Sequence, residues 1–592
     1  MNLSLRRTCL SLIFLATCCV LPVIVNGQTN KWAWARVCDN SANVEGYLVA
    51  TDAGGNVYAG LYNQNHTAVL NFGSVTVTTL NAYYNAVVVK YDPAGNAIWG
   101  LPLQGNGSLI GIATGGASSS DVSGDLYLFG SFSDSITIGT TTLHTTIGEY
   151  YLAQVSSSGA VNWAIKDGGN SAAGFSPISY YGLSGGIGLD SAGGVYVSTY
   201  FSGKSIHEGP NVLYNADTSG GSFDIMIAKY TKNGVIQWAK RAGGVKNDFV
   251  RSFAVSPSGG CHITGTFLSP SIGFGTTTIT GPVGSNPSMF IAKYDNAGIP
   301  LWAESSGAFQ AQPTGIATDP AGNVFVTGAF GDTVVVGGST IVNPTHGVGN
   351  FFLTKLDSNK HFLWNKSATF PTGVTVNPAG VATLAVTTDH CGNVWIDGPM
   401  GHTGAPVYAF LLDGHRIDSA PLTNHFPLHP QDPGFVAGFS SAGSFISGKA
   451  LQSGFDDMTT LACGPSGSLY LASDFVGGYL IAGIDTFLDT SYVEHFLLAR
   501  YSYDSVSCLA FSGVKDLPAA NEYMLYPNPA TSTVRITAPG PEIRVAIFDA
   551  PGRMVLKQDF QAPECEVNIA GLQPGIYFVR INETTIRKLV KE

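Results

Sequence analysis

The chain has 592 residues, of which 12% are charged, and a formal net charge of −11 from 29 Lys and Arg against 40 Asp and Glu. A hydrophobic fraction of 44% is enough to build a packed core, which excludes a wholly disordered chain. The acidic balance argues against a nucleic-acid-binding protein, because such a protein needs clustered basic side chains. Low charge and 73 glycines favour strands and tight turns over helices, so we expect an all-β fold.

The N-terminus has the layout of a secretory signal peptide. Two basic residues, Arg6 and Arg7, precede an uncharged apolar run that ends in small residues, which predicts a signal peptide over residues 1–27. A membrane anchor is one alternative, but the run is short for an anchor and Pro22 interrupts it. A lipoprotein signal ending at Cys18 is another. We therefore expect an exported chain with no transmembrane segment in its mature part.

A repeat then runs along most of the chain. Its first phrase is an apolar strand, a turn of the form Asp-x-x-Gly-Asn and a second apolar strand, as in IATDPAGNVFVTG from Ile316. Because Asp caps such a turn and Gly takes its positive φ, each copy is predicted to be a β-hairpin. A calcium loop is the alternative, but one Asp per loop supplies too few ligands. The copies align at Tyr58, Tyr127, Tyr196, His262, Phe325, Trp395 and Tyr470.

A second phrase follows each first one. It consists of an apolar strand, a turn with glycine and a strand that carries tryptophan, as in VVVKYDPAGNAIW ending at Trp99. In the sixth unit the best match is at 411–414, which places a long connection over residues 417–459 behind it. Each unit then holds two hairpins, and seven four-stranded sheets set radially form a β-propeller. An open solenoid is the alternative, and it would need capping units at its ends.

The two ends of the repeat region predict that the ring closes on itself. Residues 31–35 resemble a lone fourth strand, and the seventh unit reaches Tyr501 with only a weak fourth strand of its own. We expect the N-terminal strand to complete this last unit, which would bring Cys38 and Cys508 close enough for a disulfide. The cysteines after residue 27 form no C-x-x-C pair, so neither a zinc site nor a redox site is predicted.

The units resemble the SBBP-type seven-bladed propeller repeats of secreted bacterial proteins. The D-x-x-G-N-V-Y-x-x-G and F-x-x-K-Y-D-x-x-G phrases carry this resemblance. It covers residues 28–515, in repeats of about 69 residues, and implies a seven-bladed β-propeller. It says almost nothing about activity, because one fold serves many functions.

After the repeats the composition shifts towards Arg, Glu and Pro, which predicts a linker over residues 516–523 and a second domain over 524–592. Short alternating strands separated by turn residues favour a small β-sandwich. A Y-P-N-P opening at Tyr526, an F-D-x-x-G-R phrase at Phe548, an L-x-P-G-x-Y phrase at Leu572 and a basic tail resemble the type A C-terminal sorting domain of the Bacteroidetes type IX secretion system. The resemblance implies export by that machinery, followed by release or surface attachment. An adhesive immunoglobulin-like module is the alternative.

No catalytic, metal-binding or cofactor-binding residue is predicted, and no cofactor is expected. A G-x-S-x-G sequence at 182–186 lacks the strand-turn-helix context of a nucleophile elbow. His425 and His429, two histidines of a local group, have the i, i+4 spacing of a helical metal pair, but Pro427 and Pro430 argue against a helix there. This histidine group comprises His390, His402, His415, His425 and His429.

Ligand-binding residues cannot be assigned from the sequence, but one face of the ring is favoured. Connections between the second and third strands of a unit run about 20–26 residues in most units, longer than ordinary hairpin loops. They emerge at the same end of the ring as the connections between units, and long loops on a rigid scaffold often carry function. We expect this face, including His425, Phe426 and His429, to make any ligand contact.

Together these features predict a secreted or cell-surface propeller that acts as a non-enzymatic binding, adhesion or display module. Its expected partners are the type IX secretion machinery and a glycan or protein ligand, but no nucleic acid. The alternative is a secreted glycan-acting hydrolase or lyase with its site in the propeller channel. A structural role in the surface layer is a third interpretation.

Overall fold

The computed structural model describes residues 31–38, 43–63, 68–80, 85–114, 124–146, 148–168, 185–281, 287–306, 311–343, 349–370, 381–400, 409–418, 432–455, 460–465, 467–482, 485–503, 524–526, 528–537, 541–549, 553–562, 564–582 and 585–592. The regular secondary structure of these residues is all β, which confirms the predicted fold class. No helix in this part of the chain has the length and apolar character needed to cross a membrane. The chain divides into two compact units, Met1–Ser505 and Val506–Glu592.

The first unit is built from antiparallel sets of four strands. We call each set a blade and name it by its first and last strands. The blades are β2 (Val44–Thr51), β3 (Val57–Asn63), β6 (Asn85–Tyr91) and β7 (Ala97–Thr114); the end of β7 with β8 (Leu126–Ile138), β10 (Glu149–Val155) and β11 (Val161–Asp167); β12 (Gly186–Leu189), β13 (Val195–Phe201), β16 (Asp224–Tyr230) and β17 (Ile236–Gly243); β18 (Asp248–Val255), β19 (Cys261–Phe267), β22 (Ser288–Tyr294) and β23 (Pro300–Ser305); β24 (Gln312–Thr318), β25 (Val324–Phe330), β28 (Asn350–Leu356) and β29 (Phe362–Lys366); β30 (Ala385–Thr388), β31 (Val394–Pro399), β34 (Asp432–Phe439) and β35 (Phe445–Phe455); and β36 (Thr460–Gly464), β37 (Ser468–Ala482), β38 (Asp485–Ser502) and β1 (Lys31–Val37).

The blades are arranged in a ring. The first strand of each blade contacts the first strand of the next in an unbroken cycle that runs β2, β7, β12, β18, β24, β30, β36 and back to β2. Because these strands contact one another around the ring, they lie innermost, and the fold is a β-propeller. The hydrophobic core lies between facing blades: Tyr196 and Ile227 of one blade pack with Val250, Cys261 and Ile263 of the next.

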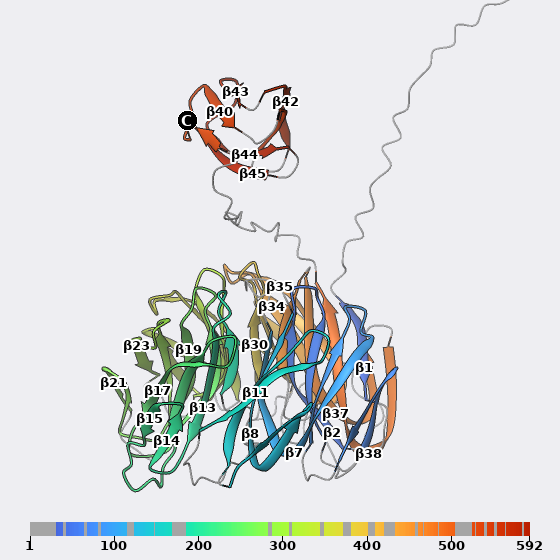
Figure 1. Ribbon diagram of the computed structural model, residues 1–592, viewed down its shortest axis with the longest axis vertical. Helices are drawn as coiled ribbons and strands as arrows, with labels where there is room; N and C mark the ends of the chain where they lie inside the picture. Colours follow the sequence, from blue (N-terminus) through green and yellow to red (C-terminus); the bar gives the residue numbers. More distant parts are fainter. Residues whose placement is uncertain are drawn as a thin grey trace, which may run out of the picture. The chain divides into compact units, whose positions relative to one another are not determined.

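The ring closes through the chain's N-terminal strand, as predicted. β1 pairs antiparallel with β38, with Ala35 opposite Ala499, and the two strands lie side by side in Figure 1. Trp32 and Trp34 are only 5% and 7% exposed. The prediction of a disulfide between Cys38 and Cys508 at this closure is wrong, because Cys38 carries a buried thiol.

The tight turns follow the chemistry that the sequence indicates. In the β12–β17 blade, Asp190 accepts hydrogen bonds from the backbone of Ala192 and Gly194 across the turn into β13, and Gly193 takes a φ of +81°. A residue with a Cβ would be strained at this φ, which explains the recurrent glycine. The predicted hairpins of both phrases are therefore confirmed in this blade.

The long connections between second and third strands fold into small hairpins of their own. In the β18–β23 blade the first strand of this hairpin pairs with the last strand of the preceding blade, Ala242 opposite Phe274. The hairpin strand β21 lies at the outer edge of the unit in Figure 1. The hairpins are β4 (Ala68–Phe72) with β5 (Val75–Thr79), the end of β8 with β9 (Thr141–His144), β14 (Ser205–Glu208) with β15 (Asn211–Tyr214), β20 (Ser271–Phe274) with β21 (Thr277–Thr280), β26 (Thr333–Val336) with β27 (Ser339–Val342), and β32 (Ala409–Leu412) with β33 (His415–Asp418). Much of the sequence that was expected to form loops on one face therefore packs as hairpins between blades.

The β30–β35 blade corrects one assignment. The turn at Asp413 and Gly414 joins β32 to β33, so it belongs to a small hairpin rather than to the last hairpin of the blade. That last hairpin is β34 with β35, whose turn is closed by a hydrogen bond from Gly443 N to Ser440 O. The long connection therefore lies between the second and third strands, as in the other blades, and not behind the blade.

The second unit contains two antiparallel sheets. One holds β39 (Met524–Tyr526), β40 (Thr533–Thr537) and β43 (Glu564–Asn568), and the other holds β41 (Ile543–Asp549), β42 (Met554–Phe560), β44 (Gly575–Ile581) and β45 (Thr585–Lys591). Val534 and Val567 of the first sheet share one hydrophobic core with Val545, Val579 and Leu589 of the second.

Candidate functional site

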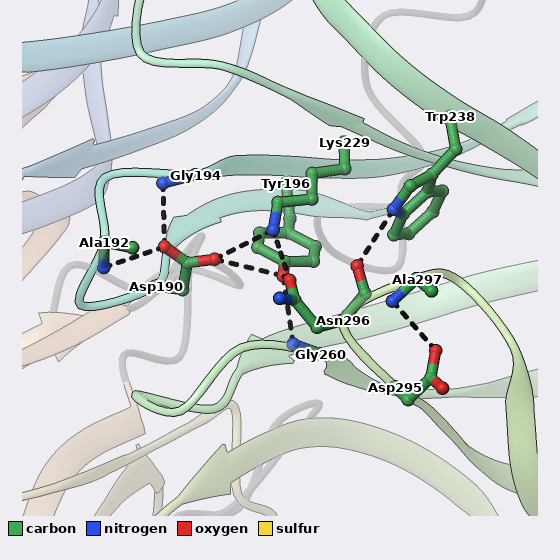
Figure 2. Close-up of polar contacts among 10 residues, drawn as sticks. All are labelled: Asp190, Ala192, Gly194, Tyr196, Lys229, Trp238, Gly260, Asp295, Asn296 and Ala297. Carbon is green, nitrogen blue, oxygen red and sulfur yellow. Dashed lines mark hydrogen bonds and ion pairs between the residues drawn. The ribbon is translucent and has the colours of Figure 1, made fainter.

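A buried polar cluster follows the first strand of the β12–β17 blade (Figure 2). Asp190 Oδ1 accepts hydrogen bonds from the N–H groups of Ala192 and Gly194 at 3.0 and 2.7 Å. Asp190 Oδ2 lies 3.1 Å from Lys229 Nζ and accepts a hydrogen bond of 3.1 Å from Tyr196 Oη. Both members of the ion pair are buried, so the pair is shielded from solvent.

This cluster joins its blade to the next one. Asn296 lies in the turn between β22 and β23, and Figure 2 shows it facing Tyr196 and Lys229, which both donate to its Oδ1. Trp238 Nε1 donates to Asn296 O at 3.0 Å, and Gly260 N donates to Tyr196 Oη at 3.0 Å. One blade thus forms hydrogen bonds with two turns of the next blade.

The same joint recurs around the ring. Lys90 and Trp99 donate to Ser157 O, Lys293 and Trp302 to Ser358 O, Lys355 and Trp364 to Ser441 O, and Arg500 and Trp34 to Pro93 O. The buried ion pair recurs as Lys90 with Asp52 at 3.8 Å and Lys355 with Asp319 at 3.4 Å. A cluster that repeats from blade to blade joins blades, so a functional site is better sought where the repeat is broken.

The β18–β23 blade breaks the repeat inside this joint. His262 stands where neighbouring blades carry tyrosine or phenylalanine, and Ser256 replaces the turn aspartate. His262 is fully buried, its ring packs against Trp302 with centroids 5.9 Å apart, and neither ring nitrogen has a hydrogen-bond partner among the described residues. Burial, reinforced by the nearby Lys293 charge, lowers the pKa of His262 to about 3. His262 is therefore neutral and closed off from solvent.

A pair of carboxyl groups on the wall between two blades was missed by sequence reasoning. Tyr230 Oη donates to Glu208 Oε2 at 2.6 Å and lies 3.4 Å from Asp167 Oδ2. Burial, and then the Asp167 charge, raises the pKa of Glu208 well above its ordinary value. Paired carboxyl groups are the apparatus of a glycosidase, but Glu208 is only 1% exposed and cannot meet a substrate.

This buried acid makes a pH prediction. An acid whose folded pKa is raised holds its proton in the folded state above pH 4.5, where the unfolded chain has lost it, so stability falls as pH rises towards the folded pKa. Each unit of raised pKa amounts to about 1.4 kcal/mol. We expect the wild-type chain to lose stability between pH 5 and pH 8 and Glu208→Gln to lose less, so that the stability difference shifts in favour of the variant as the pH rises. Urea unfolding at both pH values measures this, with exposed Glu542→Gln in the second unit as the control. An unchanged pH dependence would contradict the raised pKa.

Three aromatic side chains that follow no repeat gather at one end of the ring. Tyr200 lies near the end of β13, Phe223 just before β16, and Phe249 near the start of β18. The Tyr200 ring centroid is 5.3 Å from that of Phe223 and 5.2 Å from that of Phe249, and the Phe223 and Phe249 centroids are 5.4 Å apart. All three side chains are partly exposed. The cluster lies at the end of the ring where the connections between blades run, which is the end favoured by the sequence.

Two buried carboxylates hold the segments that carry this cluster. Asp224, next to Phe223, accepts hydrogen bonds from Ala216 N at 2.8 Å and from Arg241 Nη1 at 2.7 Å. Asp248, next to Phe249, accepts hydrogen bonds from Gly244 N at 2.6 Å, Ser269 Oγ at 2.9 Å and Leu268 N at 3.2 Å. Burial raises the pKa of Asp248 to about 6. The backbone next to Phe223 and Phe249 is therefore held in place by hydrogen bonds to buried carboxylates.

Arg251 completes the cluster. It is the extra residue of a bulge in β18, between Val250 and Ser252, and its Cζ lies 6.0 Å from the centroid of the Phe249 ring. Burial lowers the pKa of Arg251, and the nearby Tyr200 opposes this effect. β18 belongs to the inner cycle of strands, so Phe249 and Arg251 are carried by the innermost strand of their blade.

The residues that the sequence singled out are only partly placed. Gly182, His402, His425, Phe426 and His429 lie outside the described residues, as does Cys508. Two members of the histidine group are described: His390 is exposed, and the His415 ring stacks on Phe445 with centroids 4.4 Å apart. Among the described residues no cluster of His, Cys, Asp or Glu has the arrangement of a metal site. Cys391 is disulfide-bonded.

Comparison with known families identifies the C-terminal unit. Residues 524–592 match the family model described as the secretion system C-terminal sorting domain. The chain therefore carries a type IX sorting domain at its C-terminus, and it is a secreted or cell-surface β-propeller.

Other likenesses are remote. An uncharacterized WD repeat-containing protein of Acanthamoeba polyphaga mimivirus is 28% identical over 142 residues, which is 21% of this chain and 10% of that protein. The chain thus matches about a tenth of that relative's length. Among solved structures, PorZ, a surface component of the type IX secretion system of Porphyromonas gingivalis, is 10% identical with a TM-score of 0.19, covering 96% of this chain and 100% of PorZ. YCF48 bound to D1 peptide is 10% identical with a TM-score of 0.31, covering 82% and 100%.

Proposed function

We propose that this protein is a non-enzymatic binding module displayed at the cell surface. In this proposal residues 1–27 are a signal peptide, residues 28–515 a seven-bladed SBBP-type propeller, residues 516–523 a linker, and residues 524–592 a sorting domain with a β-sandwich fold. The propeller is the cargo, and the sorting domain delivers it through the type IX machinery.

The observation that carries this proposal is the non-repeated cluster of Tyr200, Phe223, Phe249 and Arg251. Partly exposed aromatic rings beside a cation are typical of binding surfaces, because they offer apolar area and a directed charge at little entropic cost. The polar joints between blades keep the scaffold under the cluster rigid. Rigid presentation of a few non-repeated side chains suits recognition.

One observation favours the enzymatic alternative. Arg251 and Tyr200 are near enough to influence each other electrostatically, and a cation beside a phenol could serve a lyase that acts on an acidic glycan. The discriminating measurement is turnover. The full chain incubated with an acidic polysaccharide should give no new unsaturated or reducing ends if the protein only binds, whereas sustained product formation would establish the alternative.

The export part of the proposal makes its own prediction. Deleting residues 524–592 should leave the chain inside the outer membrane of a host with type IX secretion, because the signal peptide alone reaches only the periplasm. Cell fractionation and surface labelling of intact cells measure this. As a control, a reporter fused between residues 1–27 and 524–592 should reach the surface or medium. Surface display of the deleted chain would contradict the assigned role of the sorting domain.

A further inference from the structure

Arg251 is unusual among the cations of this chain. The chain as a whole is acidic, yet this guanidinium, carried by the innermost strand of its blade, is partly buried, and among the described residues it makes neither an ion pair nor a hydrogen bond. Its guanidinium lies over the Phe249 ring, and Tyr200 is near enough to act on its charge. A partly buried charge without a counter-ion is costly, so a site of this kind is normally completed by a partner.

The neighbouring carboxylates do not supply that partner. Asp224 Oδ2 lies 2.7 Å from Arg241 Nη1, on the last strand of its own blade. Asp248 is committed to backbone N–H groups and to Ser269. Both carboxylates therefore hold the loops in place, and among the described residues neither of them pairs with Arg251.

The aromatic rings beside Arg251 define what else that partner contacts. Tyr200 meets both phenylalanine rings nearly at right angles, with interplanar angles of 88° and 87°, so the cluster presents ring faces and ring edges together. The C–H face of a sugar ring packs well on such apolar surfaces, while hydroxyl groups remain free to bond elsewhere. Guanidinium groups bind carboxylates through two parallel hydrogen bonds.

From this arrangement we infer that Arg251, Tyr200, Phe223 and Phe249 form a subsite for an acidic sugar, with the sugar carboxylate on Arg251 and the sugar ring on the aromatic side chains. This inference rests on the proposed binding function and names its ligand class. The segments that carry Phe223 and Phe249 are tied together by hydrogen bonds from Asp248 N to Phe223 O at 2.8 Å and from Phe223 N to Asn247 Oδ1 at 3.2 Å, and the Tyr200 ring packs against both phenylalanine rings. The subsite is therefore formed before its ligand arrives, which limits the entropic cost of binding.

The test is titration calorimetry of the full chain with three probes: an oligogalacturonate, the neutral oligogalactan of the same length, and acetate. We expect the oligogalacturonate to bind, the neutral sugar to bind about tenfold or more weakly, and acetate alone to bind poorly because it lacks the ring. Arg251→Met should weaken oligogalacturonate binding about tenfold or more and leave the neutral sugar unchanged. Lys232→Met, which removes an exposed cation from the turn between β16 and β17, is the matched control and should change neither.

The outcomes separate this inference from the proposed function. Equal binding of acidic and neutral sugars, unaffected by Arg251→Met, would overturn the acidic-sugar subsite and leave a binding module with another preference. Acetate binding as tightly as the oligogalacturonate would show a bare carboxylate site and would also overturn the inference. Steady cleavage of the oligogalacturonate would instead overturn the non-enzymatic function. Phe249→Ala, which keeps Arg251, should weaken both sugars if the rings carry the sugar face.

Discussion

Deleting β1, Lys31–Val37, is expected to abolish the cooperative unfolding of the propeller unit. β1 is the last strand of the closing blade and pairs with β38 over its whole length. The deletion removes two buried tryptophans, Trp32 and Trp34, and truncating one such side chain to alanine costs about 3–5 kcal/mol. The sum is comparable with the whole stability of an ordinary domain, about 5–15 kcal/mol.

The deletion should also expose β38 as an edge. An unpaired strand edge pairs readily with other chains, so we expect aggregation in addition to a lost transition. Calorimetric unfolding and light scattering of the intact and deleted chains measure both effects. Trp34→Ala is the milder form, with an expected loss of about 3–5 kcal/mol, and Ile98→Ala, at a position 49% exposed, is the control with an expected change below about 0.5 kcal/mol. An intact transition in the deleted chain would show that β1 does not close the ring.

Much of the ring could be predicted because its information is local. The Asp190 turn needs one carboxylate and one glycine within four residues, and both are visible in the sequence. The closure of the ring could be predicted because the N-terminal strand resembles the fourth strand of a unit, and no first three strands come before it. Such signals depend on backbone hydrogen bonds between near neighbours and not on the rest of the fold.

The β30–β35 blade was misassigned because its chemistry departs from the repeat. Asp413 and Gly414 imitate the turn of the last hairpin, whereas the real turn carries Ser440 in place of aspartate. Gly438 replaces the usual lysine because Trp395 fills the space opposite it, and a Cβ on Gly438 would lie 2.6 Å from the Trp395 ring. That exchange of volume between two strands can be seen only once their register is known.

The candidate site was hidden for a related reason. Tyr200, Phe223 and Phe249 lie on three segments of two blades, and none of them belongs to a repeated phrase. Single aromatic residues of this kind are far more often part of a core than part of a site. Only their meeting beside Arg251, which lacks an acid partner among the described residues, distinguishes them.

Neutralising the acid of a blade joint, Asp190→Asn, is expected to lower the free energy of unfolding by about 3–5 kcal/mol, because it leaves Lys229 buried without its counter-charge. The double variant Asp190→Asn with Lys229→Met should recover part of this loss, since a neutral pair no longer buries a lone ammonium.

The neighbouring blade provides the matched control for this prediction. Lys293 donates to Ser358 O at 2.9 Å like its counterparts, but Ser256 stands at the position of the turn aspartate. Burial lowers the pKa of Lys293, and the charge of Asp357 opposes this effect. We therefore expect Lys293→Met to cost less than Asp190→Asn, about 1 kcal/mol for the lost hydrogen bond. Urea denaturation of the single and double variants measures the coupling. Additive effects of Asp190→Asn and Lys229→Met would mean that the hydrogen bonds to Asn296, and not the ion pair, hold the blades together.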